Sequence, residues 1–381
     1  MRLFENINID FLGKRKTFYI VSLIVISLGL LTVFIKGLEY GIDFRGGSEV
    51  IVSFNKPVNL ADVRSAASQI GIGNVEVKTY GTTLENILIR TPLQEISQDQ
   101  FDRIVVNIRK TIEEVIPETL YTIKEKTANT IVFSFSSPDT ARLISDQLLL
   151  KGFQAGLYSQ EEANKDVIVR VGVSDLIREG LREKFSGYTF EIIKEDRVGP
   201  KIGKELRRDA VIAVLLSLVV ILIYLGFRFK FIFGVGAVLA LFHDVLVTLG
   251  FVSFFNGLFP GLNLEITQSV IAAFLTLVGF SVNDTVVVFD RIRENLKIHK
   301  TMDLKNLFNM SINRTLSRTI LTSGTVFLVI LALLLFGGEV NRGFAFTFMI
   351  GILTGTYSSI FIASAFVYDW TMKRKKGKIE F

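Results

Sequence analysis

The sequence contains no cysteine and only two histidines, His243 and His299. The lack of cysteine excludes a disulfide scaffold, a thiol nucleophile, an iron–sulfur site and a cysteine-based zinc site. Two histidines are too few for a multi-histidine metal centre, so we expect neither a metal nor another cofactor. Charged residues are also scarce. They make up 21% of the 381 residues, against about 25% in soluble domains, whereas 49% of the residues are hydrophobic.

The hydrophobic residues are concentrated in long runs. A bilayer core of about 30 Å is crossed by about 20 helical residues. Six segments meet this requirement: 18–35, 210–227, 231–255, 266–289, 320–336 and 343–366. We therefore predict an α-helical integral membrane protein with six transmembrane helices. This class excludes a freely soluble enzyme and a simple nucleic-acid-binding protein.

Lysine and arginine are distributed unevenly over the segments that connect these runs. The segments 1–17, 228–230, 290–319 and 371–381 together carry 18 of them, whereas 256–265 and 337–342 carry one. Because positively charged short loops stay in the cytoplasm, both termini are predicted to be cytoplasmic. The basic tail 371–381 would then touch anionic membrane lipids.

This orientation divides the chain into four parts. They are a cytoplasmic N-terminus with the first helix (1–36), an extracytoplasmic domain (37–209), a five-helix bundle (210–370) and the tail (371–381). Within the bundle, the basic segment 291–318 is partly amphipathic, and we predict an interfacial helix on the cytoplasmic face there.

The extracytoplasmic segment shows an internal repeat. Two stretches, about 49–126 and 130–196, each have the pattern of strand, helix, strand, strand, helix, strand. Asn59, Ser97 and Ser174 are suitable N-cap residues, and Pro138 suits the first turn of a helix. We predict an α+β domain of two superposable ferredoxin-like β-α-β-β-α-β units in tandem. This plan implies no chemistry by itself, and no triad, P-loop or metal-ligand spacing accompanies it, so we expect no enzymatic activity.

Two glycine-containing motifs flank this domain. The run Gly41-Ile42-Asp43-Phe44-Arg45-Gly46-Gly47-Ser48 opens it, and Val198-Gly199-Pro200 leads back to the second hydrophobic run. The GK[ST] signature of a phosphate-binding loop is absent from both. We interpret them as tight chain reversals with structural roles for Gly41, Asp43, Gly46, Gly47, Gly199 and Pro200.

Several polar residues lie inside the predicted spans, where each ionisable group costs roughly 2.5–3.5 kcal/mol on insertion and indicates function by default. His243 and Asp244 fall in the middle of the third span. They fit either polar contacts between packed helices or a proton relay. Asn283 and Asp284 lie in the cytoplasmic half of the fourth span, and Arg318 lies at the inner edge of the fifth.

Helical spacing places some of these residues on common faces. Arg318 and Thr322 are four apart and share a face. For Asp284 two interpretations remain open: a buried structural contact with an arginine or a cap, or a carboxylate that titrates as a carrier of protons or cations. Asp290 is interpreted as a solvated helix end, and Asn283 and Asp290 also remain candidates, with His243 and Asp244, for a relay or for helix packing.

The motifs together resemble one family. The glycine motif follows the first span, Val198-Gly199-Pro200 precedes the second, and His243-Asp244 lies in the third. The run from Val278 to Asn295 and the run Asn313-Arg314-Thr315-Leu316-Ser317-Arg318-Thr319 follow. This arrangement resembles the SecF family of the bacterial Sec protein-export machinery, relatives of the resistance-nodulation-division transporters.

The resemblance implies a function and partners. It implies an accessory subunit that pairs with SecD, associates with the SecYEG channel and YajC, and uses the proton motive force to promote preprotein translocation across the bacterial cytoplasmic (inner) membrane. In this family the residue matching Asp284 is a proton-path carboxylate, and those matching Arg318 and Thr322 lie in the same path. The implied coupling ion is H⁺, although an aspartate also suits Na⁺.

Two points qualify this expectation. SecF outer domains usually hold one ferredoxin-like unit, so the unit at about 130–196 is extra. The alternative function is half of a resistance-nodulation-division-type exporter of small molecules or lipids. Such exporters carry two large outer loops and twelve spans in one chain, whereas six spans and one loop favour a heteromeric partner.

Overall fold

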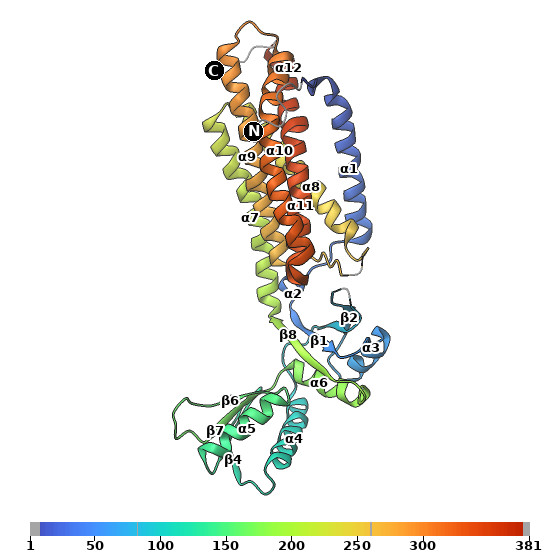
Figure 1. Cartoon of the computed structure of the whole chain (residues 1–381), viewed down its shortest axis with the longest axis vertical. Helices are drawn as coiled ribbons and strands as arrows, with labels where there is room; N and C mark the ends of the chain where they lie inside the picture. The colour runs from blue at the N-terminus through green and yellow to red at the C-terminus, as the bar shows by residue number, and fades with distance from the viewer. Residues whose placement is uncertain (1–7, 82, 260, 376–381) are drawn as a thin grey trace. The chain divides into compact units, whose positions relative to one another are not determined.

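The computed structural model describes residues 8–81, 83–259 and 261–375 (Figure 1). The chain divides into two compact units. The membrane unit comprises the chain up to Gly41 and from Glu205 onward, and the α+β unit comprises Ile42–Lys204.

The membrane unit confirms the prediction of six membrane-spanning helices. Within the described residues, six helices are long and apolar enough to cross a bilayer. They are α1 (Arg15–Lys36), α7 (Pro200–Arg228), α8 (Phe231–Phe255), α9 (Gln268–Ile298), α10 (Leu304–Phe336) and α11 (Gly338–Ser358), the last continued by a π-helical segment η2 (Ser359–Ser364) and α12 (Ala365–Lys375). A single turn, η1 (Leu12–Lys14), precedes α1.

The helices of this unit differ in how much of their surface the chain itself covers. In the most hydrophobic part of α8 and of α11 to α12, 56% of the residues are buried, against 6% in α1 and α7. Helices α8, α9, α10 and α11 lie side by side (Figure 1). The apolar faces of α1 and α7 are therefore open to lipid or to another subunit.

The prediction of a separate interfacial helix over 291–318 is wrong. Helix α9 continues to Ile298, and α10 starts at Leu304 after a short turn, so the segment consists of the ends of two spans. Its polar residues bind the N-terminal segment instead: Asn309 Oδ1 accepts from the backbone N–H of Leu12, at 3.1 Å. Lys305 Nζ lies 2.7 Å from Asp10 Oδ2 and, mainly through this hydrogen bond, lowers the pKa of Asp10 to about 2.

The α+β unit contains every predicted strand and helix, in the predicted order. The elements are α2 (Ile42–Arg45), β1 (Gly47–Phe54), α3 (Leu60–Gln69), β2 (Glu76–Thr79), β3 (Asn86–Thr91), α4 (Gln98–Val115), β4 (Tyr121–Lys126), β5 (Thr130–Phe135), α5 (Pro138–Leu150), β6 (Gln154–Leu157), β7 (Asp166–Arg170), α6 (Val173–Lys184) and β8 (Phe190–Val198). Asn59, Ser97 and Ser137 cap α3, α4 and α5 through their side chains. Ser174 is not a cap, because α6 starts one residue earlier, after Gly172.

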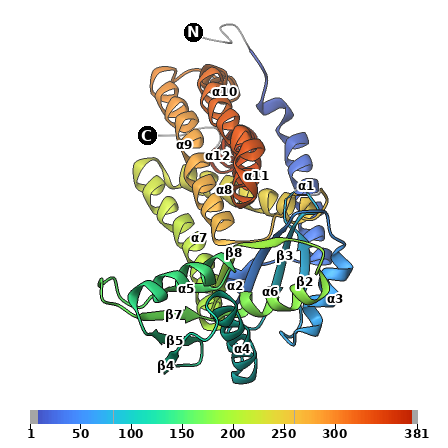
Figure 2. The ribbon, with the colours of Figure 1, turned by 60° about the horizontal axis from the view of Figure 1, so that its bottom comes forward.

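The two predicted repeats exchange their last helix and strand, so the tandem units 49–126 and 130–196 do not exist as such. The two four-stranded antiparallel sheets have the orders β2-β3-β1-β8 and β4-β5-β7-β6 (Figure 2). Strand β8, from the second repeat, pairs with β1, and β4, from the first repeat, pairs with β5. Likewise α6 packs on α3, and α4 packs on α5.

Each sheet nevertheless has the ferredoxin-like strand order. The first module consists of β1, α3, β2, β3, α6 and β8, and the second module, α4 to β7, is inserted within it. Aromatic contacts account for the choice of partner strands. Phe190 of β8 packs on Phe54 of β1, with ring centroids 5.2 Å apart. Tyr121 of β4 lies edge-on to Phe133 of β5, at 5.5 Å.

A charged triad sets the register of the first sheet. Glu49 on β1 and Glu76 on β2 both lie opposite Arg90 on β3. The Arg90 guanidinium lies 2.5 Å from Glu49 Oε2 and 3.4 Å from Glu76 Oε2, and both Glu49 and Arg90 are buried. A slip of one residue would bury these charges without partners.

The glycine motif does reverse the chain, around the short helix α2. Gly46 and Gly47 have φ values of 75° and 115°. A Cβ on Gly47 would lie 2.4 Å from the carbonyl oxygen of Thr91, and one on Gly46 would lie 3.0 Å from Cα of Pro200. The pair therefore lets β1 begin against the end of β3 and the start of α7. Asp43 lies in the first turn of α2, and Pro200 is the first residue of α7.

Candidate functional site

Asp284 is the centre of a polar cluster within the membrane unit. Its side chain comes from α9 and is 3% exposed. Oδ2 accepts a hydrogen bond from Ser323 Oγ on α10, at 2.9 Å, and lies 3.4 Å from Thr356 Oγ1 on α11. Thr356 Oγ1 also lies 2.9 Å from Ser323 Oγ. The carboxylate is thus held by hydroxyl groups from two neighbouring helices.

Arg318 and Thr322 lie on a different face of α10 from Ser323. Arg318 is exposed, and among the described residues no ion pair joins it to Asp284. Thr322 donates to the carbonyl oxygen of Arg318, at 2.9 Å, within its own helix. The structure therefore brings together Asp284 and two hydroxyl residues that the sequence did not point to, Ser323 and Thr356. Arg318 makes no ion pair with Asp284, although its charge still acts on that carboxylate.

Asp244 is the centre of a second cluster, on α8. Its side chain is fully buried, and Oδ2 accepts hydrogen bonds from Ser281 of α9 and Ser358 of α11, both at 2.7 Å. The other oxygen, Oδ1, lies 3.0 Å from Nδ1 of the neighbouring His243.

His243 connects this cluster to α1. Its Nε2 lies 3.1 Å from Ser22 Oγ of α1. Ser22 Oγ lies 2.8 Å from the hydroxyl of Tyr357 on α11, and that hydroxyl donates to the carbonyl oxygen of Phe18, again on α1, at 2.9 Å. The rings of His243 and Tyr357 stack with centroids 5.7 Å apart. Three helices, α1, α8 and α11, thus meet at one polar chain, and Ser281 of α9 reaches it through Asp244.

The end of α11 contacts both carboxylates. Thr356 faces Asp284, Tyr357 joins the His243 chain, and Ser358 donates to Asp244. The π-helical segment η2 begins at the next residue, and such segments are frequent at functional sites. A signal was present in the sequence: four consecutive polar residues, 356–359, interrupt an otherwise apolar span.

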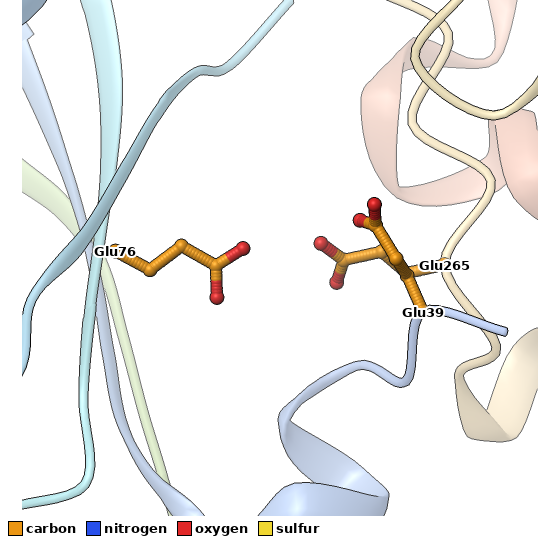
Figure 3. Close-up of side chains that lie close together, drawn as sticks. All are labelled: Glu39, Glu76 and Glu265. Atoms are coloured by element: carbon orange, nitrogen blue, oxygen red, sulfur yellow. The ribbon is translucent and has the colours of Figure 1, made fainter. Parts of the chain in front are cut away.

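The other predicted residues lie outside these clusters. Asn283 and Asp290 are exposed on α9. Gly41 belongs to the connection between α1 and the α+β unit, where its N–H donates to the carbonyl oxygen of Ile266, at 2.9 Å, and the N–H of Ile266 donates to Glu39, at 2.7 Å. These bonds bring the side chains of Glu39 and Glu265 next to each other; Figure 3 also labels Glu76, which belongs to β2.

Comparison with known proteins identifies the family. A family model described as "Protein export membrane protein SecD/SecF, C-terminal" matches residues 178–373, and the "SecD/SecF GG Motif" matches 32–58, which include the Gly46-Gly47 pair. The chain is 39% identical over 369 residues to the protein translocase subunit SecF of Rhodothermus marinus, covering 97% of this chain and 95% of that protein. The chain belongs to the SecF family.

Other members and solved structures agree with this assignment. The SecF of Koribacter versatilis is 38% identical over 386 residues, which cover 96% of this chain and 92% of that one. The crystal structure of SecDF, a translocon-associated membrane protein from Thermus thermophilus, matches 97% of this chain with a TM-score of 0.68 and 31% identity. This SecF-family chain spans 40% of that SecDF chain. A structure of SecDF in a super-membrane-facing form matches with a TM-score of 0.57.

Proposed function

We propose that this chain is the SecF subunit of a Sec protein-export complex, in which it pairs with SecD and uses the proton motive force to promote preprotein translocation. The SecF relatives are named translocase subunits, and the SecDF chain that contains a matching region is more than twice as long. A SecD-type protein therefore supplies the remaining helices, on the open faces of α1 and α7. The complex acts at the SecYEG channel with YajC, in the bacterial cytoplasmic membrane.

The buried carboxylate of Asp284 carries the proposal. Hydroxyl groups stabilise a carboxylate by donating to it, and they also tolerate its protonated form, because a hydroxyl can accept as well as donate. A directly bonded cation would instead hold the carboxylate in its charged form. Asp284 is thus placed to bind and release a proton, and each change alters the strength of the bonds to α10 and α11.

Arg318 then has a role different from a direct pair with Asp284. An exposed guanidinium on a membrane-spanning helix is costly unless an anion or water reaches it. We place it at the contact with SecD, where a carboxylate of the partner would neutralise it. Thr322, one turn away, would lie at the same contact. The coupling ion in this proposal is H⁺; replacing Na⁺ in the assay buffer distinguishes the two ions.

The proposal is tested by gradient-dependent export. Membrane vesicles containing this chain as the sole SecF, together with its SecD, are assayed for preprotein translocation with and without a proton gradient. We expect Asp284→Asn to reduce export to the level measured without a gradient, with normal amounts of folded protein. Asp290→Asn, which removes an exposed carboxylate of the same helix, is the matched control and should keep gradient-dependent export.

Two results would refute the proposal. One is full gradient-dependent export by Asp284→Asn. The other is export that is normal in vesicles lacking the chain altogether. The alternative of a small-molecule or lipid exporter is not favoured by the comparisons, in which the relatives are translocase subunits.

A further inference from the structure

The hydrogen bonds around His243 form a chain in which the protons can be counted link by link. It has four links: Asp244 Oδ1 to His243 Nδ1 (3.0 Å), His243 Nε2 to Ser22 Oγ (3.1 Å), Ser22 Oγ to the Tyr357 hydroxyl (2.8 Å), and that hydroxyl to the carbonyl oxygen of Phe18 (2.9 Å). Each link needs one proton between its two heavy atoms. Ser281 and Ser358 contribute their own protons to the other oxygen of Asp244 and supply none to this chain.

Because the chain ends at the carbonyl oxygen of Phe18, the donor and the acceptor in each link can be assigned in turn. A carbonyl oxygen only accepts, so the Tyr357 hydroxyl must donate to Phe18. Its oxygen can then only accept from Ser22, and the Ser22 oxygen must accept from Nε2 of His243. Nε2 therefore carries a proton, and a neutral imidazole has no second proton for Nδ1.

The remaining link, between Asp244 and His243, therefore requires one additional proton. If Asp244 were a carboxylate and His243 neutral, a lone pair on Nδ1 would face a charged oxygen at 3.0 Å. The link forms only when the pair holds one more proton, either on Nδ1 or on Oδ1. In both forms the net charge of the pair is zero, which suits a site that is buried within the membrane unit.

We propose that His243 and Asp244 form a second proton-binding site, and that its proton sets the number of hydrogen bonds that join α1 to α11. On release the proton passes to water, and the pair becomes a neutral imidazole with a carboxylate. Three protons then remain for four links, so one link must open.

The link that opens is one that holds α1. A charge-assisted bond from Nδ1–H to the Asp244 carboxylate is stronger than a neutral one, so the remaining imidazole proton moves to Nδ1. Nε2 then accepts from Ser22, and Ser22 can no longer donate to Tyr357. Either that link or the link from Tyr357 to Phe18 is lost, and both join α1 to α11.

The groups around the His243–Asp244 pair are consistent with its binding and releasing a proton independently of other sites. Within the described part of the chain, His243 is the only ion-pair partner of Asp244. Of the titratable groups on the packed elements, Tyr357 belongs to the chain and Asp284 lies one helical turn beyond Ser281 on α9. Tyr19 of α1 hydrogen-bonds to Asp369, at 3.4 Å. The charged residues of α1 and α11 lie near the ends of those helices, and those of α9 beyond Asp284 lie in its last turns, from Asp290 onward. Helix α1 is also held by its crossing with α8 at Gly29 and Gly250 and by the ion pair of Arg15 with Asp369, at 2.8 Å. The loss of one bond therefore shifts the helix and does not release it. The inference does not depend on the role proposed for Asp284.

Because the chain has no native cysteine, single cysteines can be introduced into the full chain and labelled specifically in complex with its SecD partner. Spin labels are placed on single cysteines at exposed positions of α1 and α8, Leu31 and Leu239, and the distance between them is measured from low to high pH. The wild-type distance distribution should shift as the pH rises. In Asp244→Asn the shift should be lost, because an amide N–H supplies a permanent proton to Nδ1 while its oxygen still accepts from both serines.

Two further variants separate this proposal from simple packing. Ser22→Ala disconnects the His243–Asp244 pair from Tyr357, so it should abolish the pH-dependent shift. Ser281→Ala, which removes a donor to the other carboxylate oxygen, should keep a pH-dependent shift. A wild-type distribution that does not change with pH, or a shift that persists in Asp244→Asn, would overturn the proposal.

A measurement without new labels complements these variants. In His299→Gln, His243 is the only histidine, and ¹⁵N spectra report its two ring nitrogens separately. At low pH we expect both nitrogens in hydrogen bonds with a proton at Nε2, and at high pH an unprotonated Nε2. A ring with a free nitrogen at low pH, or no change between the two conditions, contradicts the proton count.

Discussion

The two membrane carboxylates have the same kind of hydrogen-bond donor. Asp244 and Asp284 each accept hydrogen bonds from hydroxyl side chains of neighbouring helices, and neither has a lysine or arginine as an ion-pair partner among the described residues. A buried pair with a permanent cation would resist protonation. Serine and threonine accept or donate by rotating one hydroxyl. The residue types around both acids therefore suit groups that change charge during a working cycle.

The contacts of Asp284 predict unequal effects for two adjacent residues of α10. Ser323 donates to Asp284, at 2.9 Å, whereas Thr322 donates to a carbonyl of its own helix. Ser323→Ala removes a charge-assisted bond worth roughly 1.5–3 kcal/mol, so it should change the pH dependence of gradient-driven export. We expect Thr322→Val to leave this pH dependence unchanged. Export measured over a range of pH values for the two variants provides the test.

A lower export rate in Thr322→Val with an unchanged pH profile would place Thr322 at the contact with SecD. If Thr322→Val shifted the pH profile and Ser323→Ala did not, the hydrogen bond between Ser323 and Asp284 would not be present in the working protein. Abundance and partner binding of both variants are measured as controls.

At the scale of elements, the crossing of α1 and α8 depends on a pair of glycines. A Cβ on Gly250 would lie 2.6 Å from Cα of Gly29, which is closer than packed atoms allow. Gly250→Ala should therefore destabilise the membrane unit by roughly 1–3 kcal/mol, as overpacking does. A Cβ added to Gly279, on α9, would meet no atom within 4 Å, so Gly279→Ala should be neutral or slightly stabilising.

Thermal unfolding of the purified protein in detergent compares the two glycine variants directly. Equal melting temperatures for Gly250→Ala and the wild type would mean that α1 moves away from α8 without a measurable cost. In that case the close approach would not contribute to stability.

The exchange between the two ferredoxin-like modules predicts which deletions are tolerated. Removing 130–196 deletes β8 together with β5 to β7, which leaves β1 without its edge strand and β4 without any partner. Removing 95–171, with a flexible linker in its place, deletes the inserted module and keeps all four strands of the first sheet. We expect the second deletion to accumulate as a stable membrane protein and the first to be degraded.

Limited proteolysis of the two deletion proteins in membranes is the measurement. A protease-resistant fragment from the 130–196 deletion, equal in stability to that of the 95–171 deletion, would support tandem units instead. The α+β core of the intact protein provides the reference pattern.

At the scale of the whole molecule, two helices connect the units. Both α1 and α7 lead into the α+β unit, and both expose most of their apolar surface. Both helices are therefore continuous in sequence with the unit whose first sheet contains β1 and β8. The proton-dependent hydrogen bonds of α1 would act at one of these two connections.

The charge asymmetry of the connecting segments predicts the orientation of the molecule. Single cysteines at Ser186, in the α+β unit, and at Lys300, in the turn between α9 and α10, are both exposed. In intact spheroplasts a membrane-impermeant maleimide should label Ser186→Cys and spare Lys300→Cys until the membrane is opened. Labelling in the opposite order would reverse the orientation, and with it the direction of the proposed proton path.

Composition and the order of neighbouring residues were enough to predict the features that depend on local interactions. In a bilayer, the backbone N–H and C=O groups of a long apolar run find hydrogen-bond partners within the run only if it forms a helix. The six membrane-spanning helices could therefore be predicted. The strands and helices of the α+β unit were predicted from the alternation of apolar and polar residues and from N-cap residues such as Ser97. The role of the glycine motif as a chain reversal was predicted from the need for glycine in tight turns. The motif around Asp284 also identified the family.

The folded packing was needed to show which elements and side chains contact one another. Strands β4 and β8 are both edge strands with many exposed residues, so alternation could not assign them to a sheet; long-range contacts such as Phe54 with Phe190 did. Helical spacing relates residues within one helix, and therefore it paired Arg318 with Thr322. The partners of Asp284 and His243 come from other helices, and their identity depends on how those helices pack.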